Sequence, residues 1–160
     1  MNSQLTSSAK RVQSALIQMG VNLEVLELPS STRTAQEAAN TIGCQVGQIA
    51  KSLVFRGLNS ACCILVVASG INRVDEIKIG ELLGEPIGKA DADFVRENTG
   101  FAIGGIPPIG HLRALTIFID EDLSRYQEIW AAAGTPNSVF KLTPKTLEAI
   151  TKGRICCVKK

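Results

Sequence analysis

The segment ACCILVVA, residues 61–68, constrains the fold more than any other part of the chain, because every one of its residues is apolar. A short apolar run rich in β-branched residues is typical of a strand that is covered on both faces. The preceding segment IAKSLVF, residues 49–55, predicts a second strand, joined to the first through RGLNS. A chain with such a strand needs packing layers on both sides of its sheet.

Helical patterns supply those layers. Apolar residues recur at helical spacing from Leu5 to Met19, and Gly20 follows as a stop signal. Thr34 and Glu37 have the spacing of a capping box, with Gly43 closing the helix that follows. Three further helices are expected from their start signals and closing glycines: Asp75 to Gly84, Asp91 to Gly100, and a last one from Thr143-Pro144.

Further strands are expected between these helices, at 22–28, at 114–119 and in the closing stretch RICCVKK. A hairpin of EIWAAA and SVFKL around 134–137 completes the set. Helices and strands mix without strict alternation, and the chain shows no repeat or linker. We therefore predict one domain over residues 1–160, of the mixed α/β (α+β) class.

Composition excludes several classes of protein. The formal net charge is only +2, with both signs mixed along the chain, so DNA is not an expected partner. The five cysteines include two vicinal pairs and no C-x-x-C spacing, which favours neither a zinc site nor a disulfide framework. The first residues lack the apolar core of a signal peptide, and no stretch approaches 18 apolar residues. A reduced, cytoplasmic protein without a membrane partner is the expectation.

Two common kinds of catalytic site are also disfavoured. The segment GEPIGK, residues 84–89, imitates a phosphate loop but has one residue too few between its glycines, and Ala90 follows the lysine. The single histidine, His111, would have to serve any catalytic triad, and no G-x-S-x-G elbow is present.

Lys51 is a more informative residue. In a strand over 49–55, its side chain shares a face with Ile49, Leu53 and Phe55. An ammonium on an apolar face must reach water or meet an anion. Lys51 is therefore either a strand-end lysine extended to solvent or an anion-binding lysine at the mouth of a pocket.

The segment GGIPPIGH, residues 104–111, holds unusually many backbone-restricting residues. Gly104 and Gly105 permit conformations and close approaches that side chains forbid, and Pro107 and Pro108 fix the turn that follows. The segment is either a rigid connection between strands or a backbone wall whose N–H groups face a ligand oxygen.

Taken in order, four stretches resemble the YbaK/ProX family of aminoacyl-tRNA deacylases, which is related to the editing domain inserted in bacterial prolyl-tRNA synthetases. They are TAQEAANTIGCQVGQIAKSLVF, ILVVASGINRVDEIKIGELLG, KADADFVRENTGFAIGGIPPIGH and AGTPNSVFKLTP. The resemblance covers residues 25–155 approximately and implies a strongly curved mixed sheet or partial barrel surrounded by helices.

The resemblance also implies which residues form the site. Lys51 matches the family's strand lysine, which engages the phosphate or adenosine region of the charged tRNA end, and Gly104 and Gly105 match the backbone that lines the aminoacyl ester pocket. We expect these three to be catalytic. The expected substrate-binding residues lie beside the glycines, in the turn after them and in the loop of the later hairpin: Ile103, Ile106, Pro108, Gly110, His111, Thr135 and Asn137.

The activity implied is trans-editing: hydrolysis of a wrongly attached amino acid from tRNA, with Cys-tRNA(Pro) and Ala-tRNA(Pro) as candidate substrates. No metal or other cofactor is expected. The expected partners are the 3′ end of an aminoacyl-tRNA and, as a candidate, an aminoacyl-tRNA synthetase. Two alternatives stay open: a non-catalytic module that binds the aminoacyl-tRNA end or a synthetase, and a general esterase that acts without tRNA.

Overall fold

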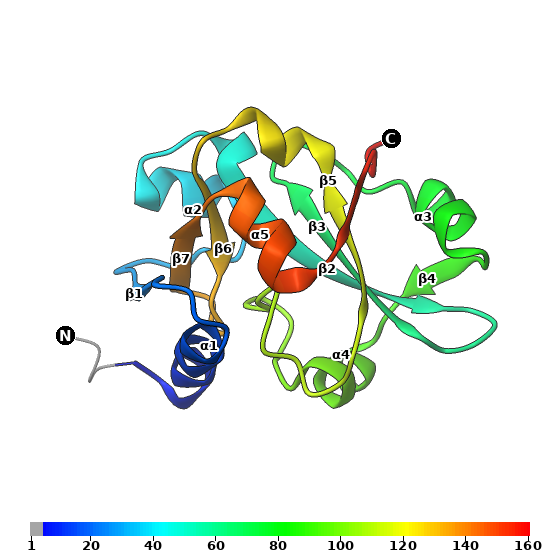
Figure 1. Cartoon of the computed structure of the whole chain (residues 1–160), viewed down its shortest axis with the longest axis horizontal. Helices are drawn as coiled ribbons and strands as arrows, with labels where there is room; N and C mark the ends of the chain where they lie inside the picture. The colour runs from blue at the N-terminus through cyan, green and yellow to red at the C-terminus, as the bar shows by residue number, and fades with distance from the viewer. Residues whose placement is uncertain (1–4) are drawn as a thin grey trace.

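The computed structural model describes residues 5–160, in which a mixed sheet of eight strands carries five α-helices (Figure 1). The sheet is not closed, and its strands follow the order β1-β7-β6-β2-β3-β5-β8, with β4 paired to β2 at one end. The strands are β1 (Val25–Glu27), β2 (Ile49–Gly57), β3 (Cys63–Ser69), β4 (Ile87–Lys89), β5 (Thr116–Asp120), β6 (Ile129–Ala132), β7 (Ser138–Leu142) and β8 (Arg154–Cys156).

The pairing directions make the sheet mixed. The central pair β2 and β3 is antiparallel, as are β6 with β7, β7 with β1, and β4 with β2. The pairs β2–β6, β3–β5 and β5–β8 are parallel and join segments far apart in the chain. The fold is therefore the mixed α/β, single-sheet architecture that the sequence predicted, in its open form.

The helices begin and end where the sequence signals lie. They are α1 (Ser7–Gln18), α2 (Ala35–Ile42), α3 (Glu76–Leu83), α4 (Ala92–Thr99) and α5 (Pro144–Thr151). The Thr34 hydroxyl accepts the N–H of Glu37, and the Glu37 carboxylate accepts the N–H of Thr34, so the predicted capping box is formed. Gly43, Gly84 and Gly100 close α2, α3 and α4 in the left-handed conformation.

Strand β3 is buried throughout and divides the core in two. Leu65 and Val67 face one side, where they join a cluster with α1 and α5. Ile64 and Val66 face the other side, where Ile79 of α3 covers them. The prediction of a strand covered on both faces is thus confirmed. Nearby on that second face, α2 packs Ala38 and Ala39 against Ile49 of β2.

The structure differs from the sequence predictions mainly in length. The strand expected over 22–28 is reduced to β1, and β4 was not expected at all. Strand β4 lies in the segment that imitates a phosphate loop, where it pairs Ile87 to Lys89 with the end of β2. A strand of three residues is too short to show an alternating pattern in the sequence. No helix within residues 5–160 is long and apolar enough to cross a membrane.

Candidate active site

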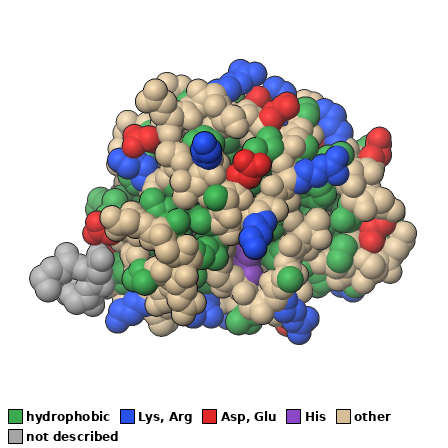
Figure 2. Space-filling view, in the orientation of Figure 1, with side chains coloured by type: hydrophobic (Ala, Val, Ile, Leu, Met, Phe, Trp, Pro, Cys, Tyr) green, Lys and Arg blue, Asp and Glu red, His purple; other side chains and the backbone are tan. Residues whose placement is uncertain are grey.

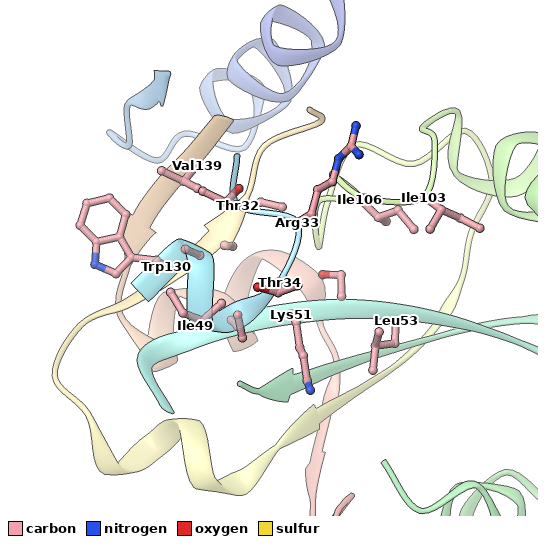
Figure 3. Close-up of a pocket in the computed structure, with 18 of the residues that line it drawn as sticks. Thr32, Arg33, Thr34, Ile49, Lys51, Leu53, Ile103, Ile106, Trp130 and Val139 are labelled. Carbon is pink, nitrogen blue, oxygen red and sulfur yellow. The ribbon is translucent and has the colours of Figure 1, made fainter. Parts of the chain in front are cut away.

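The candidate active site is a cavity of about 520 Å³ beside β2 (Figure 3). Strand β2 pairs with β6 only at residues 49–50 and with β4 only at residues 55–57. Between these two short pairings, residues 51–54 have no strand partner on that edge, and the sheet opens. The segment 32–34 before α2, the segment 103–106 and parts of β6 and β7 enclose the space that results.

Backbone groups of β2 face this opening. The N–H of Gly57 donates to Cys62 and the carbonyl of Ile49 accepts from Gly70, so odd-numbered residues of β2 direct their backbone groups toward β3. Because these directions alternate along a strand, Ser52 and Val54 direct theirs toward the cavity. The Ser52 hydroxyl is the one buried side-chain oxygen of the described residues without a hydrogen-bond partner.

Gly104 and Gly105 form the opposite wall, and each position requires glycine for a different reason. Gly104 has φ of +103°, a left-handed conformation that disfavours side chains. At Gly105, an added Cβ would lie 2.6–2.8 Å from backbone atoms of Thr135, which is too close for any side chain. The N–H of Gly134 donates to the carbonyl of Gly105 at 2.8 Å and fixes this approach. The wall is thus held rigidly against the β6–β7 hairpin.

Backbone N–H groups of the glycine wall lack hydrogen-bond acceptors. Among residues 5–160, no group accepts a hydrogen bond from the backbone N–H of Gly104, Gly105 or Ile106. Gly105 and Ile106 are buried, and buried N–H groups are nearly always paired in folded proteins. Unpaired N–H groups beside a cavity are suited to bind a ligand oxygen.

Lys51 lines the cavity, but its ammonium lies away from the glycine wall. In Figure 3 the side chain runs from β2 toward β3, on the side opposite Ile103 and Ile106. Burial and the nearby Arg73 guanidinium lower the pKa of Lys51, whereas the Asp120 carboxylate opposes that shift. The expected face is confirmed, since Ile49, Leu53 and Phe55 pack on this side of the sheet.

The charges of the cavity are all positive. Arg33 and Lys51 are the charged residues that line it, and the lining includes no aspartate, glutamate, histidine or cysteine. Arg33 was not expected at a cavity, because its position directly before the capping box indicates a helix start and gives no sign of a binding site. A site of this composition can bind the phosphate end of a substrate, and it holds no carboxylate, imidazole or thiol that could act as general base.

His111 and Gly110 lie outside this cavity, in a separate surface hollow with Lys10, Arg11 and Ser14 of α1. The Nε2–H of His111 donates to the carbonyl of Pro107 at 2.7 Å, which makes the histidine part of the turn. Burial lowers the pKa of His111, and the bond to Pro107 opposes that shift. The structure therefore does not bring His111 together with Lys51 and the glycines.

Three more predicted residues support the wall rather than line the cavity. Pro108 is buried in the turn. Thr135 lies against Gly105, and its hydroxyl contacts Asn137 and Ser138. The Asn137 amide donates to the carbonyl of Leu28 at 3.2 Å and connects the loop to the end of β1. The predicted Ile103 and Ile106, in contrast, both line the cavity.

The face of the molecule drawn in Figure 2 carries both acidic and basic side chains, without a large patch of one sign. Within residues 5–160, no group of three or more His, Cys, Asp or Glu side chains is arranged to hold a metal ion.

Comparison with known proteins identifies the family. The model of the aminoacyl-tRNA editing domain matches residues 29–150. The uncharacterised protein YwhH of Bacillus subtilis is 34% identical over 148 residues, which are 92% of this chain and 94% of that protein. EbsC of Enterococcus faecalis, a proposed Cys-tRNA(Pro)/Cys-tRNA(Cys) deacylase, is 25% identical over 122 residues, 76% of this chain and 74% of EbsC.

A solved structure extends the likeness to the whole fold. The crystal structure of a proposed trans-editing enzyme for prolyl-tRNA synthetase is 50% identical and superposes with a TM-score of 0.93, covering 98% of this chain and 99% of that one. The matched family region contains Lys51, both wall glycines and the loop that supports them. The chain belongs to the aminoacyl-tRNA editing domain family.

Proposed function

We propose that this protein is a trans-editing hydrolase that releases a wrongly attached amino acid from tRNA, with Cys-tRNA(Pro) and Ala-tRNA(Pro) as its candidate substrates. Membership of the editing-domain family and the likeness to EbsC and to a proposed trans-editing enzyme support this choice. The candidate substrates follow from the family resemblance and from EbsC, whereas the mechanism is argued from the site itself.

The observation that carries the proposal is the set of unpaired N–H groups at Gly104, Gly105 and Ile106. In the proposed complex, the ester carbonyl lies against this wall. The ribose and phosphate of the terminal nucleotide extend along the open edge of β2 toward Lys51. Lys51 and the wall residues Gly104, Gly105 and Ile106 all line this one cavity.

The proposed chemistry is positioning with electrostatic stabilisation. A nucleophile adds to the ester carbonyl, and the backbone N–H groups stabilise the negative charge that develops on its oxygen. The tetrahedral intermediate then collapses, the ribose oxygen leaves and takes up a proton, and free tRNA results. The nucleophile is water, whose proton passes to the leaving ribose oxygen as the free amino acid forms, or the thiol of an attached cysteine, which leaves as a cyclic thioester. Attack by the vicinal ribose hydroxyl only moves the acyl group between the two ribose oxygens, so water must then attack to free the tRNA. The cavity lining holds no carboxylate or imidazole to act as base.

Two other functions predict different results. A binding module of the same fold would retain an aminoacyl-tRNA end or a synthetase without turnover. A general esterase would cleave small acyl esters as well as charged tRNA. The unpaired N–H groups of the wall favour catalysis over binding alone, because a donor aimed at a developing oxyanion accelerates the reaction. We also propose a cytoplasmic location and an aminoacyl-tRNA synthetase as partner; the similar structure described as a trans-editing enzyme for prolyl-tRNA synthetase makes that synthetase the first candidate.

The test is release of labelled amino acid from a panel of tRNAs charged with cysteine, alanine, serine, threonine or proline. Catalytic amounts of protein should release label from a mismatched pair, and much less from correctly charged tRNA. Binding without release would support the binding module instead. Release from a small ester at a comparable rate would support the esterase.

A further inference from the structure

A buried carboxylate lies on the same face of the sheet as Lys51, two strands away. In the register of β2 and β3, Lys51 is opposite Ala68. Strands β3 and β5 are parallel, and Val66 pairs with Phe118. Two residues further along each strand, Asp120 therefore lies beside Ala68. Side chains alternate in direction along each strand, and Lys51, Ala68 and Asp120 therefore form a row on one face. Ala68, the residue between the two charged ones in this row, carries only a methyl group and is fully buried.

Asp120 is held in a fixed orientation. It is only 1% exposed, and its carboxylate accepts hydrogen bonds from the N–H of Ser69 at 3.0 Å, the Asn72 amide at 2.7 Å and the N–H of Asp122 at 2.9 Å. The next carboxylate, Asp122, bonds Asn72, Lys159 and Arg125. Asp120 itself takes part in none of the ion pairs of the described residues, and neither does Lys51.

Burying a carboxylate without a paired cation costs folding free energy, so the presence of Asp120 calls for a group on which its negative charge acts. The charged groups near the Lys51 ammonium are Asp120 at the end of β5 and Arg73 in the loop after β3. Arg33 lines the same cavity from the segment before α2, whereas the α2 residues that line it, Ala35, Ala38 and Ile42, are apolar. Burial and Arg73 both disfavour the ammonium form of Lys51, and Asp120 is the group that favours it.

We propose that Asp120 is a positioning residue for Lys51: its buried carboxylate keeps the ammonium charged and directed over Ala68, ready to meet a phosphate of the substrate. This role rests on the proposed function of the cavity. Asp120 touches no substrate and acts only through Lys51. Arg73 opposes it, and the two together set the charge that the cavity presents to an anion.

The first experiment does not depend on activity. The Lys51 ammonium is titrated by NMR of the labelled lysine ε-carbon, assigned with Lys51→Arg. The titration midpoint should fall in Asp120→Asn, which removes the negative charge at nearly constant shape, and should rise in Arg73→Gln, which removes the positive one. A purely structural role for Asp120 does not produce shifts of opposite sign. An unchanged midpoint in a folded Asp120→Asn variant would overturn the proposal.

Because Asp120→Asn keeps only one acceptor oxygen and loses at least one of the three hydrogen bonds, folding is checked separately. In the wild-type protein, NOE contacts from the Lys51 ε-protons to the Ala68 methyl group and the Asp120 β-protons are expected. Their absence would place the ammonium elsewhere and refute the proposal even if the variant did not fold.

Kinetics then connect the pair to catalysis. On the tRNA that the wild-type protein deacylates, Asp120→Asn should lower kcat/KM about tenfold, and adding it to Lys51→Ala should cause almost no further loss. Asp122→Asn is the matched control, because it disturbs the same network without facing Lys51. If Asp122→Asn lowered kcat/KM by the same factor, Asp120 would have a structural role only. Absence of turnover in the wild-type protein, with the NMR shifts intact, would refute the proposed function and not the coupling.

Discussion

Replacing Gly105 by alanine should separate the wall from the loop that supports it. The new Cβ would lie 2.6–2.8 Å from backbone atoms of Thr135, whereas an ordinary contact begins at 3.4 Å. The two backbones must therefore move apart by roughly 0.6–0.8 Å, since neither side offers a flexible side chain that could yield. Overpacking of this kind costs about 1–3 kcal/mol of stability. A displacement approaching 1 Å at a positioning site costs about 100-fold in rate.

The assay compares deacylation under single-turnover conditions with the free energy of unfolding in urea. Gly84→Ala is the matched control: Gly84 closes α3 with φ of +96°, and an added Cβ there meets nothing within 4 Å. A side chain in that conformation costs roughly 1–2 kcal/mol, so both variants lose similar stability. Only Gly105→Ala should lose about 100-fold in rate. Wild-type turnover in a folded Gly105→Ala variant would refute the backbone-wall mechanism.

Three further predictions concern single side chains. Lys51→Ala should lower the deacylation rate at least about tenfold while the fold is kept, since it removes a charge beside the cavity. The control Lys145→Ala on α5 should keep the wild-type rate, and equal rates in the two variants would exclude a role for the Lys51 charge. His111→Gln should lower the deacylation rate only slightly, but it should flatten the pH dependence of the unfolding free energy measured in urea. Burial lowers the pKa of His111, so the wild type should lose stability as the pH falls below the unfolded value of about 6.5, and an identical profile in the variant would contradict this. Thr34→Ala should cost about 1 kcal/mol of unfolding free energy through loss of the α2 cap, with no loss expected in Thr34→Ser.

Local features of this fold could be predicted from the sequence, because their causes lie within a few residues. The capping box at Thr34 and the closing glycines of three helices act over one turn, and the apolar run of β3 is visible in itself. The two glycines likewise indicated an unusual backbone, which the structure shows as a left-handed conformation at Gly104 and a close approach at Gly105. Sequence periodicity could not show β4, whose three residues are too few for a pattern.

Features that depend on residues far apart in the sequence could not be predicted from local patterns. Asn72 and Asp120 are 48 residues apart, and nothing in either segment indicates that they meet. The space between β2 and β6 exists because their pairing stops after two residues, and strand register is a property of the assembled sheet. The family resemblance predicts His111, Thr135 and Asn137 as substrate-binding residues, because His111 ends the glycine-proline segment and the other two belong to a loop that recurs in the family. In the structure they hold the turn and the loop behind the wall.

The parallel pairings of the sheet have a consequence for the kinetics of folding. Ile49 pairs with Trp130 and Val66 with Phe118, so both contacts close long stretches of chain. The entropy of closing such loops is lost before the contacts can compensate for it, which makes these pairings slow relative to the capped helices. The cavity, which needs β2 and β6 side by side, should form after the helices do. During refolding, fluorescence from Trp130 at the cavity wall should reach its native value later than the helical circular dichroism signal.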